Sequence, residues 1–154
     1  MYHLNMKTLI LAAVVSWAFS GCALEIEVDP AKVVEAPTGA GEAIQAVADT
    51  YGMRSLPTVY WYGKGLDCMD GLGYHDQTGD CVTGDELNGV ITVALPDGVL
   101  ISALRDDWGC ALLTHEMAHA ASEQAGEGGC SNHDCRWFKG PCQGATALLE
   151  EMGI

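Results

Sequence analysis

Positively charged side chains are scarce in this 154-residue sequence, which has 7 Lys and Arg against 21 Asp and Glu and a formal net charge of −14. A protein face that binds nucleic acid phosphates needs clustered Lys or Arg, and this sequence has no such cluster. We therefore expect no nucleic-acid partner. The acidity either favours basic substrates or serves only as a soluble surface.

The sequence also lacks an apolar run of the roughly 20 residues that a membrane span requires. The apolar run from Leu9 to Phe19 is shorter, follows Lys7, and leads into Ser20-Gly21-Cys22, which is typical of a signal peptide. This ending resembles the lipobox of bacterial lipoproteins, with Phe19 where leucine is more usual. The resemblance implies cleavage before Cys22, acylation of Cys22, and an exported protein held by lipid at the bacterial cell envelope, on the outer membrane or the periplasmic face. A plain secretory signal cleaved near Gly21 is the alternative.

A Cys-x-x-Cys pair is missing as well, so we expect no cysteine zinc site. Without Cys22 the chain keeps six cysteines, an even number compatible with three disulfides in an exported protein. Cys68 and Cys81 bracket a loop rich in glycine and aspartate, and we expect them to bond to each other. The remaining four cysteines allow three pairings: Cys110, Cys130, Cys135 and Cys142. Any bond that joins Cys110 to the 130–142 region would fix that region to the helix predicted between them.

The most informative motif is Thr-His-Glu-Met-Ala-His-Ala at residues 114–120. On a helix, His115 and His119 project from one face about 40° apart, and Glu116 falls within about 60° of His119. Two neutral imidazoles can hold zinc while the glutamate takes a proton from water. The motif predicts one Zn²⁺ in a hydrolytic site with Glu116 as general base. The alternative is a helix whose histidines are only satisfied polar groups.

The residues around the motif predict a buried helix from about Asp107 to Glu123, with Asp106 and Asp107 as N-cap candidates. A hydrolytic zinc site normally has a third protein ligand. His133 is the leading candidate because it follows a glycine-rich break that ends this helix. His75 lies in a turn-rich stretch, and we expect it to be exposed or to border the cleft. The other candidates for the third ligand are carboxylates: Glu123, Glu127, Glu150 and Glu151.

Residues 114–138 resemble the SprT-like (Spartan-type) zinc metallopeptidases. The resemblance consists of the His-Glu-x-x-His motif, a gap, and then His133 followed by the aromatic residues Trp137 and Phe138. In that family the third histidine commonly sits in a His-Gly-x-x-[Phe/Trp] stretch that opens a second helix. Here Asp134 replaces the usual glycine. The broader resemblance runs from about Pro57 to the C-terminus, and residues 147–154 are similar to the family's last helix. It implies a zinc peptidase with His133 as third ligand.

The rest of the sequence predicts a small α+β domain. Residues 39–51 have apolar positions at helical spacing and end at Gly52, while residues 58–62, 89–95 and 99–104 are predicted strands. This order resembles the small zincin core, in which a short three-stranded sheet lies beside the active-site helix and its edge strand can pair with substrate. We expect a signal peptide at 1–21, the lipidated cysteine and a tether at 22–38, and one metallopeptidase domain at 39–154 that acts as a monomer.

The predicted activity is zinc-dependent hydrolysis of a peptide or protein substrate at the cell envelope. The donor for the developing oxyanion is left open among Arg136, His75 and a tyrosine. The alternative from another class is a non-catalytic, zinc-containing surface lipoprotein that binds a partner. Glu116 argues against it, because a purely structural zinc has a closed four-ligand shell. Hydrolysis of a small non-peptide amide would use the same metal site.

Overall fold

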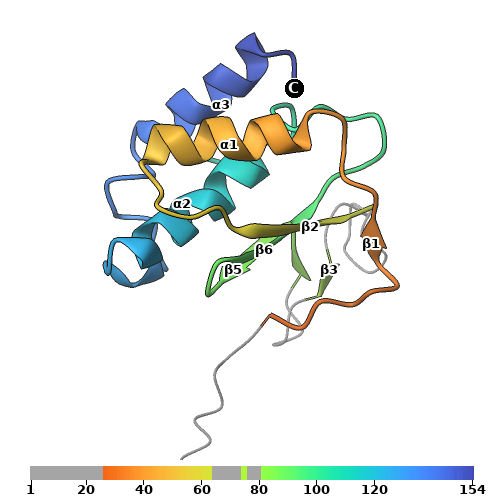
Figure 1. The fold of residues 1–154 in the computed structure, drawn as a ribbon, viewed down its shortest axis with the longest axis horizontal. Coiled ribbons are helices and arrows are strands. Elements are labelled where there is room, and N and C mark those ends of the chain that lie inside the picture. The colour runs from red at the N-terminus through yellow and green to blue at the C-terminus, as the bar shows by residue number, and fades with distance from the viewer. Residues whose placement is uncertain (1–25, 64–73, 76–80) are drawn as a thin grey trace, which may run out of the picture.

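The structure is a computed structural model that describes residues 26–63, 74–75 and 81–154 (Figure 1). The predicted signal peptide, Cys22 and Cys68 lie outside the described residues. Within the described ranges, no helix combines the length and apolar character that crossing a membrane would require.

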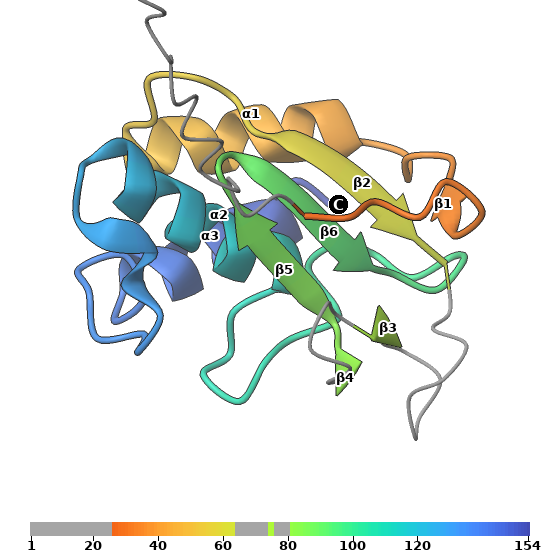
Figure 2. The same cartoon turned by 90° about the horizontal axis from the view of Figure 1, so that it is seen from below.

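A mixed four-stranded sheet has the strand order β1-β2-β6-β5 (Figure 2). β2 and β6 run parallel, whereas β1 pairs with β2 and β5 pairs with β6 in antiparallel fashion. A separate antiparallel pair is formed by β3 and β4. The strands are β1 (Val33–Val34), β2 (Thr58–Tyr62), β3 (Tyr74–His75), β4 (Cys81–Val82), β5 (Gly84–Leu87) and β6 (Val90–Ala94).

Three helices lie on one face of this sheet (Figures 1 and 2). α2 packs against β5 and β6, and α3 packs against α1 and α2. The outermost strand β5 is therefore next to the helix that carries the His-Glu-x-x-His motif. The helices are α1 (Ala40–Tyr51), α2 (Leu112–Gln124) and α3 (Pro141–Glu151), with a short 3₁₀ helix, η1 (Gly128–Cys130), between the last two.

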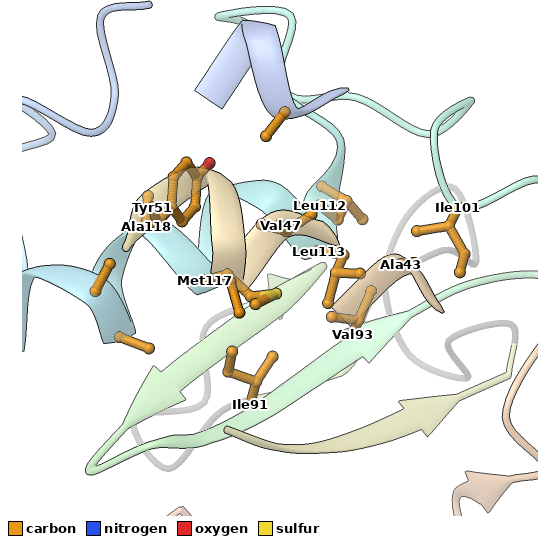
Figure 3. Packing of buried hydrophobic residues seen from close by; sticks show 14 of the residues in the cluster. Ala43, Val47, Tyr51, Ile91, Val93, Ile101, Leu112, Leu113, Met117 and Ala118 are labelled. Carbon is orange, nitrogen blue, oxygen red and sulfur yellow. The ribbon is translucent and has the colours of Figure 1, made fainter. Parts of the chain in front are cut away.

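The core forms because side chains of β6 alternate between the two faces of the sheet. Ile91 and Val93 point toward Met117 and Leu113 of α2 (Figure 3), and these four side chains are almost completely buried. Ala94 instead joins a smaller apolar cluster with Tyr62, Val28, Val33 and Val82. The main cluster fixes α2 against the sheet, and this position sets the place of the motif.

Several predicted elements are confirmed. α1 spans almost all of the predicted helix and ends at Gly52, which has the left-handed φ of +66° that favours glycine at a helix end. β2 has the predicted bounds, and β6 lies within its predicted range. Trp61 and the neighbouring Tyr62 are buried in the sheet, as expected for aromatic residues in a strand.

The strand predicted at residues 99–104 is wrong, because this segment forms turns. The Ala103 amide donates to the carbonyl of Leu100 instead of to another strand. Ile101 is buried in the main core, and the Ser102 amide donates to the carbonyl of the C-terminal Ile154. The apolar residues that suggested a strand are thus buried by packing and not by sheet pairing.

The sheet edge is β5, which the sequence prediction missed because Gly-Asp-Glu-Leu has a low propensity for strands. The Asn-Gly pair that follows β5 is a sequence signal for a hairpin turn. Asn88 and Gly89 have φ values of 54° and 76° and form the two-residue turn between β5 and β6. At the opposite edge, β1 pairs with Trp61 and Tyr62 of β2. Part of the segment predicted as a tether therefore belongs to the sheet.

The bounds of two predicted helices also need correction. α2 begins at Leu112, and its N-cap residue is Ala111 and not Asp106 or Asp107. The backbone before it forms a turn in which Asp106 Oδ1 accepts the amides of Trp108 and Cys110. α3 begins at Pro141, a residue favoured in the first helical turn, and ends before Gly153.

Candidate metal centre

Three histidines converge where α2 meets the loop after η1. His115 Nε2 lies 3.2 Å from His119 Nε2 and 3.2 Å from His133 Nε2. Ligand atoms of all three side chains lie within 4.8 Å of one another, close enough to hold one metal ion. In the part of the chain that the structure describes, this is the one group of His, Cys, Asp and Glu side chains with that property.

The hydrogen bonds of two of these rings fix which nitrogen faces the centre. His115 Nδ1 lies 2.5 Å from Asp106 Oδ2, and His119 Nδ1 lies 2.5 Å from the carbonyl oxygen of Gly129. A carboxylate and a carbonyl can only accept, so both Nδ1 atoms carry the hydrogen and both Nε2 atoms keep a lone pair. Lone pairs that face one another call for a cation between them, and a set of three imidazoles fits zinc.

Burial keeps two of the imidazoles, His119 and His133, in the form that binds metal. Burial lowers the pKa of His119 to about 4. The hydrogen bond to the Gly129 carbonyl opposes this shift, and the nearby charges of His115 and His133 reinforce it. Burial also lowers the pKa of His133. Both rings are therefore neutral at neutral pH, as a metal ligand must be.

A short disulfide loop carries His133 to the centre. Cys130 and Cys135 are bonded to each other, and the His133 amide donates to the Cys130 carbonyl over 2.9 Å. Gly128 and Gly129 turn the chain after α2 with φ values of 78° and 71°. Cys130 and His133 themselves have positive φ, of 57° and 56°, a conformation that non-glycine residues rarely adopt without such constraint.

A second disulfide joins Cys110, just before α2, to Cys142 in the first turn of α3. Cys110 thus bonds into the 130–142 region, but the bond joins α2 to α3. The loop that carries His133 is closed on itself by Cys130–Cys135 and is not fixed to α2 by a disulfide. Cys81 is also disulfide-bonded. Its predicted partner, Cys68, lies outside the described residues.

Aromatic rings surround the three histidines. The buried Phe138 ring lies 5.0, 4.9 and 4.8 Å from the rings of His115, His119 and His133, measured between centroids. Trp108, which is half exposed, lies 4.5 Å from the His133 ring and stacks on His115 at 5.8 Å. Phe138 thus packs against all three imidazoles from the buried side, and the half-exposed Trp108 packs against two of them.

Glu116 lies beside the histidines on α2 and is almost fully buried, with 6% of its surface exposed. Burial raises the pKa of its carboxyl well above the usual range, and the nearby charges of Asp85, Glu86 and Asp106 raise it further. A carboxyl group with a raised pKa holds a proton more readily, which suits a general base that works near neutral pH.

An open cleft of about 410 Å³ connects this centre to solvent. Residues 84–86 of β5 line one side, and the loop that includes Gly128, Gly129 and Ser131 lines another. Apart from the three histidines, the ionisable groups that line it are all carboxyls: Asp85, Glu86, Glu116 and Glu123.

The carboxylates proposed as other third ligands do not join the triad. Glu150 pairs with Arg105, and Glu127 pairs with Arg136 over 3.2 Å. Glu151 is exposed on α3, and Glu123 lines the cleft without reaching the triad.

Two of the predicted oxyanion donors, Arg136 and a tyrosine, are engaged elsewhere or lie outside the lining of the cleft. The Arg136 guanidinium lies 4.2 Å over the Trp137 ring, and the Tyr51 hydroxyl donates to the Thr114 carbonyl over 2.9 Å. His75 lies in β3 and not in a loop. Neither Arg136 nor a tyrosine lines the cleft in the described residues.

Sequence reasoning missed three contributors to the site. Asp106, which the sequence predicts as a helix cap, instead orients His115. The Gly129 carbonyl orients His119, and Gly84 lies against Glu116. No known protein family, curated protein or solved structure matches this chain.

Proposed function

We propose that this protein is a zinc-dependent peptidase. The observation that carries the proposal is the convergence of three imidazole Nε2 atoms next to a buried carboxyl group, Glu116, in an open cleft. Three protein ligands with space left for water are typical of catalytic zinc, whereas structural zinc has four. Membership of the SprT-like family is part of the same proposal and rests on the motif and the spacing to His133.

His115, His119 and His133 would hold the zinc ion through Nε2, and Asp106 and the Gly129 carbonyl keep two of these rings oriented. Zinc supplies Lewis-acid chemistry that polarises a carbonyl group and acidifies water. Glu116 takes a proton from the attacking water onto its carboxylate and then delivers it to the leaving amine. Phe138 excludes solvent beneath the histidines.

A peptide substrate is favoured over a small amide by the position of β5. This strand is at the edge of the sheet and lines the cleft beside Glu116. An edge strand can pair with an extended polypeptide through main-chain hydrogen bonds, which brings one peptide bond after another past the site. A small amide would gain nothing from this arrangement.

Export to the cell envelope, with a lipid on Cys22, is proposed from the sequence. The disulfides of the described residues support it, because such bonds persist in oxidising compartments. The net charge and the acidic cleft give no support to a nucleic-acid substrate.

The test is cleavage of an unstructured protein by the zinc-loaded soluble form that starts after Cys22. Glu116→Gln should bind zinc as wild type does and lose at least about 100-fold in turnover, since general-base catalysis contributes that much or more. Glu151→Gln, an exposed site on α3, is the matched control and should cleave normally. Turnover that does not depend on Glu116 would refute the mechanism, and bound zinc without turnover would favour the partner-binding lipoprotein.

A further inference from the structure

Gly84 brings the backbone of the edge strand unusually close to Glu116. A Cβ atom built on Gly84 would lie 2.4 Å from Glu116 Oε1 and 2.9 Å from both Cδ and Cγ of the same side chain. Separations below 3.0 Å are essentially never seen for real Cβ atoms. A residue larger than glycine at this position would therefore force either the Glu116 side chain or β5 to shift.

The backbone conformation does not by itself require glycine at this position. Gly84 lies in β5 opposite Val93 of β6, and it is not among the residues with positive φ. Gly89 in the adjoining turn, in contrast, has a φ of 76°. Gly84 is the first residue of β5, and a glycine in a strand often marks a place where another group approaches the backbone closely; here the close neighbour is Glu116.

An added methyl group on Gly84 would meet Glu116 at Cγ and Cδ as well as at Oε1, so a rotation of the carboxyl end alone does not relieve the contact. Glu116 is almost fully buried on α2. Relief would need the carboxyl group to turn away from β5, or the strand to move away from α2. The first change moves the carboxyl relative to His115 and His119, which are on the same helix. The second change removes the backbone of β5 against which the carboxyl rests.

We propose that Gly84 is a positioning residue: its missing side chain lets the Glu116 carboxyl lie against β5, and this contact sets where the general base stands relative to the metal ligands. The catalytic consequence rests on the proposed peptidase function. The spatial relation does not, so it can be tested without activity.

The first test measures thermal unfolding of the zinc-free protein in a double-mutant cycle. Gly84→Ala should lower the midpoint clearly in the wild-type background and much less in a Glu116→Ala background, where the crowded side chain is gone. Gly144→Ala on α3 is the control, since a Cβ there meets nothing within 4 Å. An equal effect of Gly84→Ala in both backgrounds, including a failure to fold in both, would overturn the proposal.

The second test measures kinetics and zinc content. Gly84→Ala should retain the wild-type zinc stoichiometry and KM, while kcat falls by about 10-fold to 100-fold, the range expected when a catalytic group is misplaced by about 1 Å. An unchanged kcat in an active wild-type background would contradict the proposal. An inactive wild type would refute the peptidase function instead, and the unfolding cycle would still decide the placement of Gly84.

Discussion

Asp106 combines two tasks at the level of the single residue. Its Oδ1 accepts two backbone amides before α2, and its Oδ2 accepts the Nδ1 hydrogen of His115. Carboxylates that hold a ligand histidine in this way raise the basicity of the ring and fix its orientation, and their loss typically weakens metal binding by about 10-fold to 100-fold.

Asp106→Asn should therefore weaken zinc binding by about 10-fold to 100-fold, because the neutral amide is a poorer acceptor for His115. Competition with a chromophoric chelator measures the affinity. Asp107→Asn is the matched control, since its side chain is the exposed neighbour. Equal affinities for the two variants would show that Asp106 serves the turn alone.

Glu86 should make stability depend on pH. Burial, together with Glu123 and Asp85, raises its pKa from 4.5 to about 8, although the Gly89 amide opposes the shift. The native protein thus keeps a proton that the unfolded chain releases above pH 4.5. The resulting stabilisation is complete below pH 4.5 and disappears as the pH rises through about 8.

Glu86→Gln removes this titration while keeping an oxygen acceptor for the Gly89 amide. The variant should melt at a higher temperature than wild type at about pH 8.5 and show a smaller difference at about pH 4.5. Thermal unfolding at both values measures this, with Glu151→Gln as the control. A difference that is the same at both pH values would disprove the raised pKa.

At the level of elements, two disulfides within the described residues have separable effects. Cys130–Cys135 closes the loop that carries His133, whereas Cys110–Cys142 joins α2 to α3 across 32 residues of sequence. The loop-closure model gives about 2 kcal/mol for the short loop and about 3.5 kcal/mol for the long one. The short one acts on the candidate metal ligand His133, and the long one acts on helix packing.

Cys130→Ser with Cys135→Ser should weaken zinc binding by up to about 30-fold, because His133 must then be ordered by the metal itself. Cys110→Ser with Cys142→Ser should lower the unfolding midpoint more and leave zinc affinity nearly unchanged. Affinity titrations and thermal unfolding of both double variants compare them. The reverse pattern would contradict the assignment of the short loop to the metal site.

Some of the helices and strands could be predicted from the sequence, and others could not. α1, β2 and β6 follow from apolar periodicity and β-branched residues, and the motif places His115, Glu116 and His119 on one helix. β5 was not predicted from the sequence because its residues are poor strand formers. Its position is set by the Asn88-Gly89 turn and by packing against α2. Asp106 and Gly84 could not be found because their roles depend on contacts between separate elements.

For the whole molecule, charge is the dominant surface property. The net charge is −14, and the carboxyls of Asp85 and Glu123 line the cleft. Under the proposed peptidase function, a lysine-rich peptide should therefore be cleaved faster than a glutamate-rich peptide of equal length. This preference should shrink as salt rises, because the screening length falls from about 30 Å at 0.01 M to about 3 Å at 1 M. Initial rates across that range measure it, and a salt-independent preference would assign the selectivity to other contacts.

The central claim is that three histidines from two segments form one metal centre. Zinc content of the purified soluble form, measured together with that of His119→Ala, His133→Ala and Glu116→Gln, tests it most directly. We predict one zinc per chain in wild type and Glu116→Gln, and little or none in either histidine variant. Full zinc content in His133→Ala, or no zinc in the wild type, would contradict the account.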